Sequence, residues 1–485
     1  MIRTSLDGVP VLITEAPGLL RASLVFRAGA SMATFRDQQV PHLVEHLVLS
    51  EVTRGAHEIN GSVTGQTLRF DVAGTPSEVA RFLQEVCARI RDLPAHRLEH
   101  EARIVTIEAS SCVHPALGSM AVTRYGMRGP GLVGVGGVPA SETSFARIET
   151  FVRRFLVRGN AALSLTGPLP EGLRLDLPEG PPADDPRPAA PIWELPMLLR
   201  EESPAVCFSI EVPDDESGLV LQEVLLARLR ETLRHDRGLA YGVECDLTWA
   251  PEGKVLVGIV VDGDAQRTDE IAQHSYRVLQ DLAATGPCAE ELELVQERIA
   301  RILREPASAP DFLLDQAVGL LRGSEPRTAD EVESAVRAVS APQLQEMTDR
   351  GLRTLVMVVP GDPEEDPDHP LLPGIPDRSC EVFDDEEEVS GRTFSRRLLT
   401  GAPWDLRVRA GEQGISVRVA GAVRAVAWDD LVGIAARGDA RDLIPEHGGE
   451  FTIWTGDLRH GRALRELIDS RRPDLLFTPE DVDEE

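Results

Sequence analysis

The sequence predicts an α+β protein made of two tandem, homologous α+β domains and a small C-terminal β-barrel-like domain with one helix. The chain has 485 residues, of which 42% are hydrophobic, and this is enough for more than one buried core. Two long blocks each open with strand-like segments, continue through amphipathic helices and close on a short apolar strand. A shorter C-terminal block has short strands with alternating apolar residues, followed by a single helix.

The first two blocks are similar in layout. Strand-like segments open the first block at 9–13 and 23–26 and the second at 205–210, and the closing apolar strands lie at 162–167 and 355–361. Strands and helices are mixed without strict alternation, which favours an α+β fold over a doubly wound sheet. The parallel layout indicates a tandem duplication.

Proline-rich and acidic stretches separate the blocks. Proline fixes φ and lacks an amide donor, so neither a helix nor a central strand runs through such a cluster. The predicted division is a first domain at 1–175, a proline-rich linker at 176–191, a second domain at 192–362, an acidic proline-rich linker at 363–391, a third domain at 392–478 and an acidic tail at 479–485.

In the third block the alternation places one face of each strand in a core. Strands are expected at 406–408, 415–419, 423–428 and 451–454, and a helix with Leu464, Leu467 and Ile468 on one stripe. Trp404, Trp428 and Trp454 are expected in the core of this domain. Several strands closed by one helix resemble a pleckstrin-homology-like barrel.

The charge balance is strongly acidic, with 50 basic against 80 acidic residues and a formal net charge of -30. Phosphate backbones and anionic membrane surfaces repel such a chain, so we expect no nucleic-acid partner and no membrane association. No apolar run approaches the roughly 20 residues of a membrane span, which favours a cytoplasmic protein.

A metal-binding motif stands in the first block, at His42-Leu43-Val44-Glu45-His46. On a helix, residues i and i+4 share one face, so both imidazoles can reach one zinc ion. Glu45 can hydrogen-bond a zinc-bound water and accept its proton as general base. The surrounding residues are apolar, and burying two histidines and a glutamate among them is costly without a metal or other partners.

A second His-x-x-Glu-His occurs at 96–100. It follows Pro94 and is surrounded by charged residues, so its histidines need no metal to satisfy them. We therefore assign the metal site to the first copy.

A third protein ligand is expected in the segment after this second copy. Glu101 and Glu108 lie two helical turns apart and on one stripe, with Glu108 towards the apolar end. Glu108 as ligand and Glu101 as a supporting carboxylate fit a zinc site. From spacing alone, two surface glutamates are an equally good interpretation.

These residues resemble the inverted zinc motif of the pitrilysin/insulin-degrading-enzyme family of metallopeptidases. The resemblance covers about residues 5–362, including 7–11, 26–31 and 165–167 in the first block and 233–241 in the second. In place of the family's Gly-Gly-x-x-Asn-Ala-x-Thr strand this chain has the segment 60–67, in which Thr64 stands where asparagine is usual.

The resemblance implies roles for individual residues. His42, His46 and Glu108 would bind zinc, Glu45 would be the catalytic base, Glu101 would support the site, and Arg234 and Tyr241 would bind substrate. It also implies a catalytic first domain, a substrate-binding second domain, and a substrate added as an extra strand beside the site. Because this chain is one half of the family's clamshell, a homodimer is expected, or a heterodimer with a related subunit.

The sequence therefore predicts a zinc-dependent endopeptidase acting on peptides or unfolded polypeptide segments. The alternative is a non-catalytic or partner-dependent subunit of a processing peptidase complex that binds peptides or serves in assembly.

Overall fold

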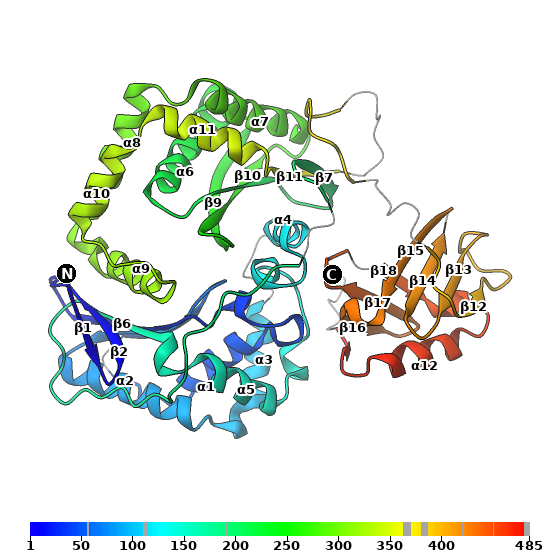
Figure 1. The fold of residues 1–485 in the computed structure, drawn as a ribbon, viewed down its shortest axis with the longest axis horizontal. Helices are drawn as coiled ribbons and strands as arrows, with labels where there is room; N and C mark the ends of the chain where they lie inside the picture. The colour runs from blue at the N-terminus through cyan, green and yellow to red at the C-terminus, as the bar shows by residue number, and fades with distance from the viewer. Residues whose placement is uncertain are drawn as a thin grey trace.

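The computed structural model describes residues 1–55, 58–109, 115–189, 193–361, 370–379, 387–419, 421–449 and 451–479. Two α+β domains are stacked with their sheets facing one another and most of their helices outside, and the third domain lies beside the first (Figure 1). About half of the predicted acidic linker and nearly all of the predicted acidic tail lie outside the described residues. Within the described ranges, no helix combines the length and the apolar character needed to cross a membrane.

The first domain contains one six-stranded sheet of order β1-β2-β6-β3-β5-β4, in which only β2 and β6 pair in parallel. Its strands are β1 (Ile2–Leu6), β2 (Val9–Ile13), β3 (Leu20–Phe26), β4 (Glu58–Val63), β5 (Leu68–Gly74) and β6 (Ala161–Leu165). Its helices are α1 (Val40–Leu49), α2 (Pro76–Arg91), α3 (Leu98–Ala109), α4 (Pro115–Tyr125) and α5 (Phe145–Phe155).

The second domain contains one five-stranded sheet of order β7-β11-β8-β10-β9, in which only β7 and β11 pair in parallel. Its strands are β7 (Met197–Glu201), β8 (Val206–Pro213), β9 (Ala240–Ala250), β10 (Lys254–Gly263) and β11 (Val356–Pro360). Its helices are α6 (Glu216–Leu229), the π-helical segment η7 (Arg230–Asp236), α7 (Thr268–Thr285), α8 (Ala289–Arg304), α9 (Ala309–Leu321), α10 (Ala329–Ala338) and α11 (Ala341–Leu352).

The two sheets share one topology once β1 is set aside. In each, the last strand of the unit lies between the first and second strands, and the third strand forms the far edge. The mixed α+β architecture and the repeated layout predicted from the sequence are thus present in the structure. Edge strand β4 of the first domain corresponds to edge strand β9 of the second.

Each of the first two domains packs one of its helices against the sheet of the other domain. Helix α9 of the second domain buries Leu313 and Leu314 against Leu12 and Val25 of the first sheet. Helix α4 of the first domain joins a buried cluster with β7, β8 and β11 of the second sheet. Each sheet face is therefore completed by the other domain, which joins the two domains through apolar contacts.

The third domain is built from two four-stranded sheets, β12-β13-β14-β15 and β18-β17-β16-β19, and one helix. Its elements are β12 (Arg392–Ser395), β13 (Arg407–Ala410), β14 (Gly414–Val419), β15 (Ala422–Ala427), β16 (Leu431–Arg437), β17 (Ala440–Pro445), β18 (Phe451–Trp454), α12 (Gly461–Arg471) and β19 (Leu476–Phe477). In the described part of the chain the strands pair into these two separate sheets, so a closed barrel stays a prediction.

The expectation for the three tryptophans of this domain is correct only for Trp428, which is 5% exposed. Trp404 is 87% exposed in the segment between β12 and β13, and Trp454 is 61% exposed. Trp454 lies on the solvent face of β18, whose residues alternate between buried and exposed. Alternating apolar and polar residues indicate that a strand has one buried and one exposed face. They do not say which face another part of the protein covers.

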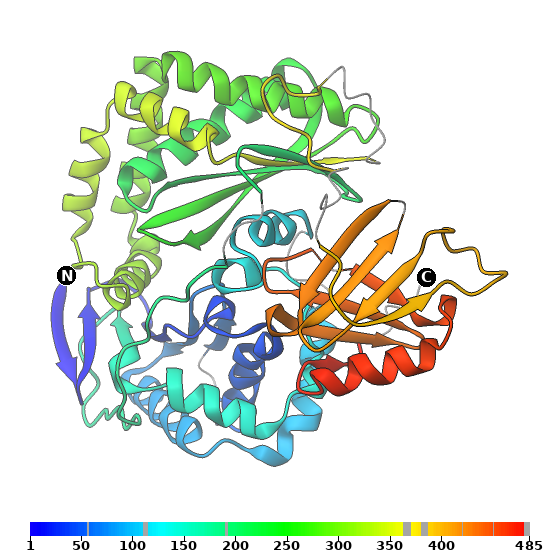
Figure 2. The same cartoon turned by 45° about the vertical axis from the view of Figure 1, so that its right-hand side comes forward.

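The third domain packs on the first through the segment that leads into α1. Phe35, in the short turn η2 (Phe35–Asp37), is buried against Phe477, with ring centroids 6.1 Å apart. Arg36 donates a hydrogen bond of 3.2 Å to the carbonyl oxygen of Leu476. Figure 2 shows the third domain turned forward, and Figure 1 labels β16 on the side of the third domain that faces the first.

The predicted linkers are partly packed rather than free. In the acidic linker, Leu372 and Ile375 are buried in the core of the second domain. In the proline-rich linker, Leu177 is buried in the core of the first. Proline forbids regular helix and central strand, but the apolar residues between prolines still bury against a neighbouring surface. These residues of the predicted linkers thus pack on the adjacent domains, and the domain boundaries themselves stay predictions.

Candidate metal centre

Helix α1 carries the first predicted motif on a largely buried element. Pro41 occupies its first turn, where a missing amide donor costs nothing. Leu43, Val44, Leu47 and Val48 are fully buried in the core of the first domain. Their burial fixes the rotation of the helix, so His42 and His46 lie on its remaining, partly buried face.

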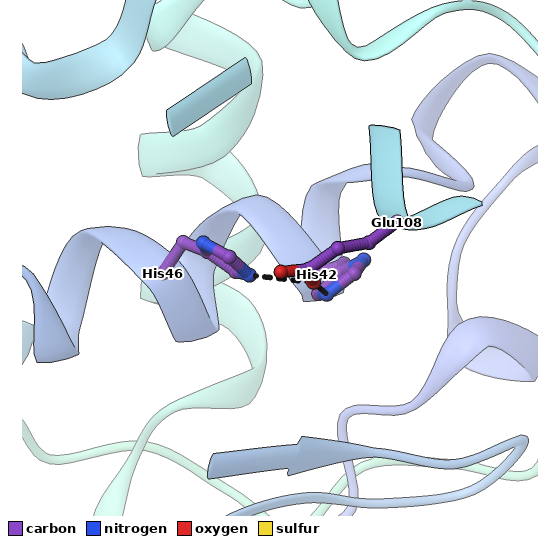
Figure 3. A group of neighbouring side chains, drawn as sticks. All are labelled: His42, His46 and Glu108. Carbon is purple, nitrogen blue, oxygen red and sulfur yellow. Dashed lines mark ion pairs between the residues drawn. The ribbon is translucent and has the colours of Figure 1, made fainter. Parts of the chain in front are cut away.

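Helix α3 brings the predicted carboxylates to this face. One oxygen of Glu108 lies 3.3 Å from Nε2 of His42 and 3.3 Å from Nε2 of His46 (Figure 3). The second residue, Glu101, places Oε2 3.3 Å from Nδ1 of His46 and accepts a 2.8 Å hydrogen bond from Arg97. All four predicted residues therefore meet, and Glu101 stands behind His46.

The burial of the two carboxylates differs from the expectation. The Glu101 side chain is 5% exposed, whereas that of Glu108 is 49% exposed. The apolar residues before Glu108 suggested the opposite order, but Glu108 lies one residue before the end of α3. The ligand candidate thus faces accessible space, and the supporting carboxylate lies in the interior.

The geometry fits a zinc ion. One donor atom from each of His42, His46 and Glu108 lies within 4.8 Å of the others. Two ligands about 2.0–2.1 Å from zinc at a tetrahedral angle stand about 3.3 Å apart, which is the separation of both His–Glu108 pairs. Charge-assisted hydrogen bonds are shorter, at about 2.7–2.9 Å.

The electrostatics of the site also suit a metal. Burial lowers the pKa of His42, and a charge on His46 would lower it further, while Glu108 acts in the opposite direction. The neutral imidazole, the form that binds metals, is therefore favoured. Burial raises the pKa of Glu45 to about 7, opposed by His46 and reinforced by the charges of Glu108 and Asp71. A carboxylate with such a pKa is suited to act as a general base near neutral pH.

Sequence reasoning did not single out the role of Gly61. This residue of β4 faces Glu45 so closely that an added Cβ would lie 2.4 Å from Oε1 of Glu45. Glycine inside a strand often marks a close approach of another group, and that was the available signal. The absence of a side chain here lets Glu45 lie against the edge strand of the sheet.

Replacement of Gly61 by Ala is expected to displace the Glu45 carboxylate. A shift of about 1 Å in a reacting group can lower a rate by about 10²-fold, so we expect a loss of that order in kcat/KM with the zinc content unchanged. Steady-state kinetics and metal analysis check this. The control is Gly136→Ala, because an added Cβ there meets nothing within 4 Å. Full activity of Gly61→Ala would contradict the inferred position of Glu45.

Replacement of Glu101 by Gln is expected to weaken zinc binding by roughly 10–100-fold. The variant keeps the size of the side chain but removes the charge that Nδ1 of His46 faces. A competition titration with a zinc chelator measures the change. An unaltered affinity would show that Glu101 does not support the site.

The second His-x-x-Glu-His does not form a comparable group. His96 lies in the turn η3 (Ala95–Arg97) before α3, and its Nε2 is 3.1 Å from Glu51. His96, Glu99 and His100 are exposed or nearly so, and in the described residues they belong to no group that could hold a metal. Because the helix begins only at Leu98, the two histidines do not share one helical face.

Arg234 and Tyr241 lie in the second domain. Arg234 is exposed in η7, and Tyr241 is 81% exposed at the start of β9. Arg234 lies in the connection between the second and third strands of its unit, and Tyr241 lies at the start of the third strand. In the first domain, α1 and the approach to β4 occupy the corresponding connection. Neither residue belongs to the His–Glu group in the described chain, so five of the seven predicted site residues, His42, Glu45, His46, Glu101 and Glu108, are brought together within one chain.

A cavity of about 760 Å³ lies between the first two domains, next to the end of β4. It is lined by Val63 and Thr64 at that end, and by residues of β9 and α9. Val63 follows Gly61 by two residues, so both project to the same face of the strand, about 6–7 Å apart. A chain lying along β4 would therefore pass from Glu45 into this cavity.

Comparison with known proteins gives a family match for part of the chain. Residues 144–299 match the family model described as the peptidase M16 inactive domain. The matched segment starts at α5 and ends in α8, so the His–Glu group lies before it. None of the curated proteins compared with the chain matches it.

Several solved structures are similar to this chain over 74% of its length. The peptidase M16 inactive domain from Pseudomonas fluorescens has 16% identity and a TM-score of 0.60, covering 74% of this chain and 98% of that one. A protease from Helicobacter pylori has 13% identity and a TM-score of 0.62, covering 74% and 98%. A chain of complex III2 from Candida albicans has 14% identity and a TM-score of 0.60, covering 74% and 95%.

At such identities the structural likeness concerns the fold. The chain thus has the fold of the pitrilysin-like M16 peptidases over 74% of its length, and its residues 144–299 are homologous to the inactive domain of that family.

Proposed function

We propose that the protein is a zinc-dependent endopeptidase that hydrolyses peptides or unfolded polypeptide segments. The observation that carries this proposal is that donor atoms of His42, His46 and Glu108 lie within 4.8 Å of one another. Glu45 lies on α1, the helix that also carries the two histidines. Zinc held by these three side chains would lower the pKa of a water molecule and polarise the scissile carbonyl.

The chain's own residues supply the remaining chemistry. Glu45 takes the proton of the attacking water and delivers it to the leaving amine. Glu101, itself held by Arg97, fixes the ring of His46 through Nδ1 and leaves Nε2 directed at Glu108. This support keeps the donors in place before substrate arrives.

Substrate is proposed to bind along β4. This strand is the edge of the first sheet, so its outer backbone groups are available to an added peptide strand. Gly61 leaves the space in which Glu45 reaches that strand. Main-chain pairing of this kind favours extended, unfolded segments over folded proteins.

Zinc analysis combined with a cleavage assay tests the proposal. The purified chain is expected to contain about one zinc ion, to cleave a quenched fluorescent peptide library, to lose activity to a chelator and to regain it with added zinc. Bound zinc without cleavage of any peptide would reject the endopeptidase function.

The second candidate is a non-catalytic subunit that binds peptides or assembles a processing peptidase complex. The family match to a domain described as inactive, and the likeness to a chain of complex III2, favour this candidate. The intact group of two histidines and two carboxylates favours catalysis, because a scaffold has no use for it. Tight peptide binding without turnover would identify the scaffold.

We also propose that two copies of the chain assemble. Arg234 and Tyr241 are exposed, and in the described chain they are not part of the His–Glu group, so a second copy is proposed to bring them to substrate there. A heterodimer with a related subunit would satisfy the same need. Light scattering of the active species distinguishes these arrangements, and a fully active monomer would reject both.

Peptides with basic side chains are expected to be preferred. The cavity beside β4 is lined by Glu244, Asp246 and Asp315, and its one basic lining residue in the described chain, Arg69, is paired with Asp71 at 3.2 Å. Burial raises the pKa of Asp315 to about 6, and Asp311 and Asp214 act in the same direction while Arg69 opposes them, as expected where carboxylates are crowded.

We expect an Arg-containing peptide to have a kcat/KM about tenfold above that of its Glu-containing counterpart at low ionic strength, and the ratio to shrink as salt is added. The double variant Glu244→Gln/Asp246→Asn should remove most of the preference. Glu293→Gln, at an exposed position of α8, is the matched control. A ratio unaffected by either the variant or salt would contradict this prediction.

A further inference from the structure

The segment between β12 and β13 exposes large apolar side chains. Leu398 is 75% exposed, Leu399 103% and Trp404 87%. Leu399 also has a φ of 68°, a left-handed conformation that is strained for a bulky residue. Three exposed, bulky residues on one short segment are unusual for a surface without a partner.

Arginines surround these apolar residues. A hollow of about 990 Å³ beside Trp404 is lined by Arg396, Arg397, Arg407, Arg418 and Arg459, with Glu388 and Asp405 as its acidic residues. Arg418 is paired with Glu388 at 2.7 Å. Within the described ranges, the other four arginines form no ion pair with a carboxylate. In a chain of net charge -30, this local excess of positive charge stands out.

This surface lies clear of the described residues of the first two domains. The opposite side of the third domain is fixed to the first domain through Phe477, Ile444 and Ala435. Strands β12 and β13 lie on the side turned away from the first two domains (Figures 1 and 2). A partner bound there would not cover β4 or the His–Glu group.

We propose that this surface, formed by Leu398, Leu399, Trp404 and the arginines of the hollow, is a docking site for an acidic, partly apolar peptide segment of another protein. Tryptophan and arginine are the residue types that most often dominate binding energy at protein interfaces. The arginines would pair with the carboxylates of the segment, and its apolar side chains would cover Trp404 and Leu398. The third domain would then tether the first two domains to that partner.

An anionic membrane has the same charge, but the observations favour a peptide. Approach to a continuous anionic surface brings the whole acidic molecule close to it, which is unfavourable. A peptide segment needs to reach only the hollow. The concave shape between Trp404 and Arg459 also suits a chain segment better than a flat bilayer.

Fluorescence anisotropy with a labelled peptide that repeats Asp-Glu-Leu tests the proposal on the full-length chain, in a Glu45→Gln background that keeps the peptide intact. We expect saturable binding, much weaker binding of the neutral peptide that repeats Asn-Gln-Leu, and about tenfold weaker binding in Arg407→Glu/Arg459→Glu. Trp404→Ala should weaken binding of the same peptide as well.

Arg350→Glu, at a 68% exposed position on α11 of the second domain, should bind the peptide like the parent chain. Thermal unfolding checks that all variants fold, which is expected because the side chains replaced on the third and second domains are exposed and glutamine has the shape of Glu45. Equal affinity of all variants for the acidic peptide would overturn the proposal. So would sedimentation with phosphatidylcholine–phosphatidylserine vesicles in the absence of peptide binding, since this outcome identifies a membrane site.

Discussion

Glu45→Gln is expected to lower kcat/KM for peptide hydrolysis by about 10²–10⁴-fold, the range contributed by general acid–base catalysis. Glutamine has the shape of glutamate, so it can keep the contact with Gly61 on β4. It cannot accept a proton, so the attacking water is no longer activated. Bound zinc should be unchanged, because Glu45 is not among the three converging donors.

The chain provides its own control for this experiment in the second His-x-x-Glu-His. Glu99→Gln makes the same chemical change in the same short motif, but the Glu99 side chain is 90% exposed. Full activity of Glu99→Gln beside an inactive Glu45→Gln would assign catalysis to α1. Equal activity of both variants and the parent chain would reject Glu45 as the base.

His46→Ala is expected to abolish metal binding, from about one zinc ion per chain to nearly none, because a catalytic zinc site depends on three protein ligands. The substitution removes one donor of the group and also leaves buried Glu101 without its imidazole neighbour. Metal analysis after gel filtration measures the loss.

The same variant should also lose the stabilisation that zinc provides. A ligand at about 100 times its Kd stabilises the folded state by about 2.7 kcal/mol, so the parent chain should show a higher Tm with zinc than without it. His46→Ala should show no such difference, and His100→Ala, at an exposed position of α3, should behave like the parent. Retention of zinc by His46→Ala would reject the assigned site.

The third domain contacts the segment that leads into the His–Glu site. Phe35 is held between the third domain and the first, and the segment from Phe35 to Gln39 leads directly into α1. Gln38 donates a 2.7 Å hydrogen bond to the carbonyl oxygen of Leu132, which ties the same segment to a second loop. The start of α1, the helix that carries His42 and His46, is thus fixed from two sides.

The strands and helices that depend on local pattern were predictable. The expected segments 9–13, 162–167 and 415–419 correspond to β2, β6 and β14, and the helix of the first motif is α1. Apolar periodicity identifies such elements because it records which side chains each element must bury. The sequence did not indicate that Leu372 is buried or that Trp404 is exposed, because neither residue lies in a segment with apolar periodicity.

The sequence by itself determined the α+β class, the repeated layout and the choice of residues that could bind a metal, because apolar spacing and ligand spacing are local properties. Only the tertiary structure decided that His46 and Glu101, 55 residues apart, lie side by side. It also decided that α4 and α9 cross between the domains, and that Gly61 admits Glu45 to the sheet edge. These contacts depend on how whole faces pack together, and residues distant in sequence carry no local signal of which face they will meet.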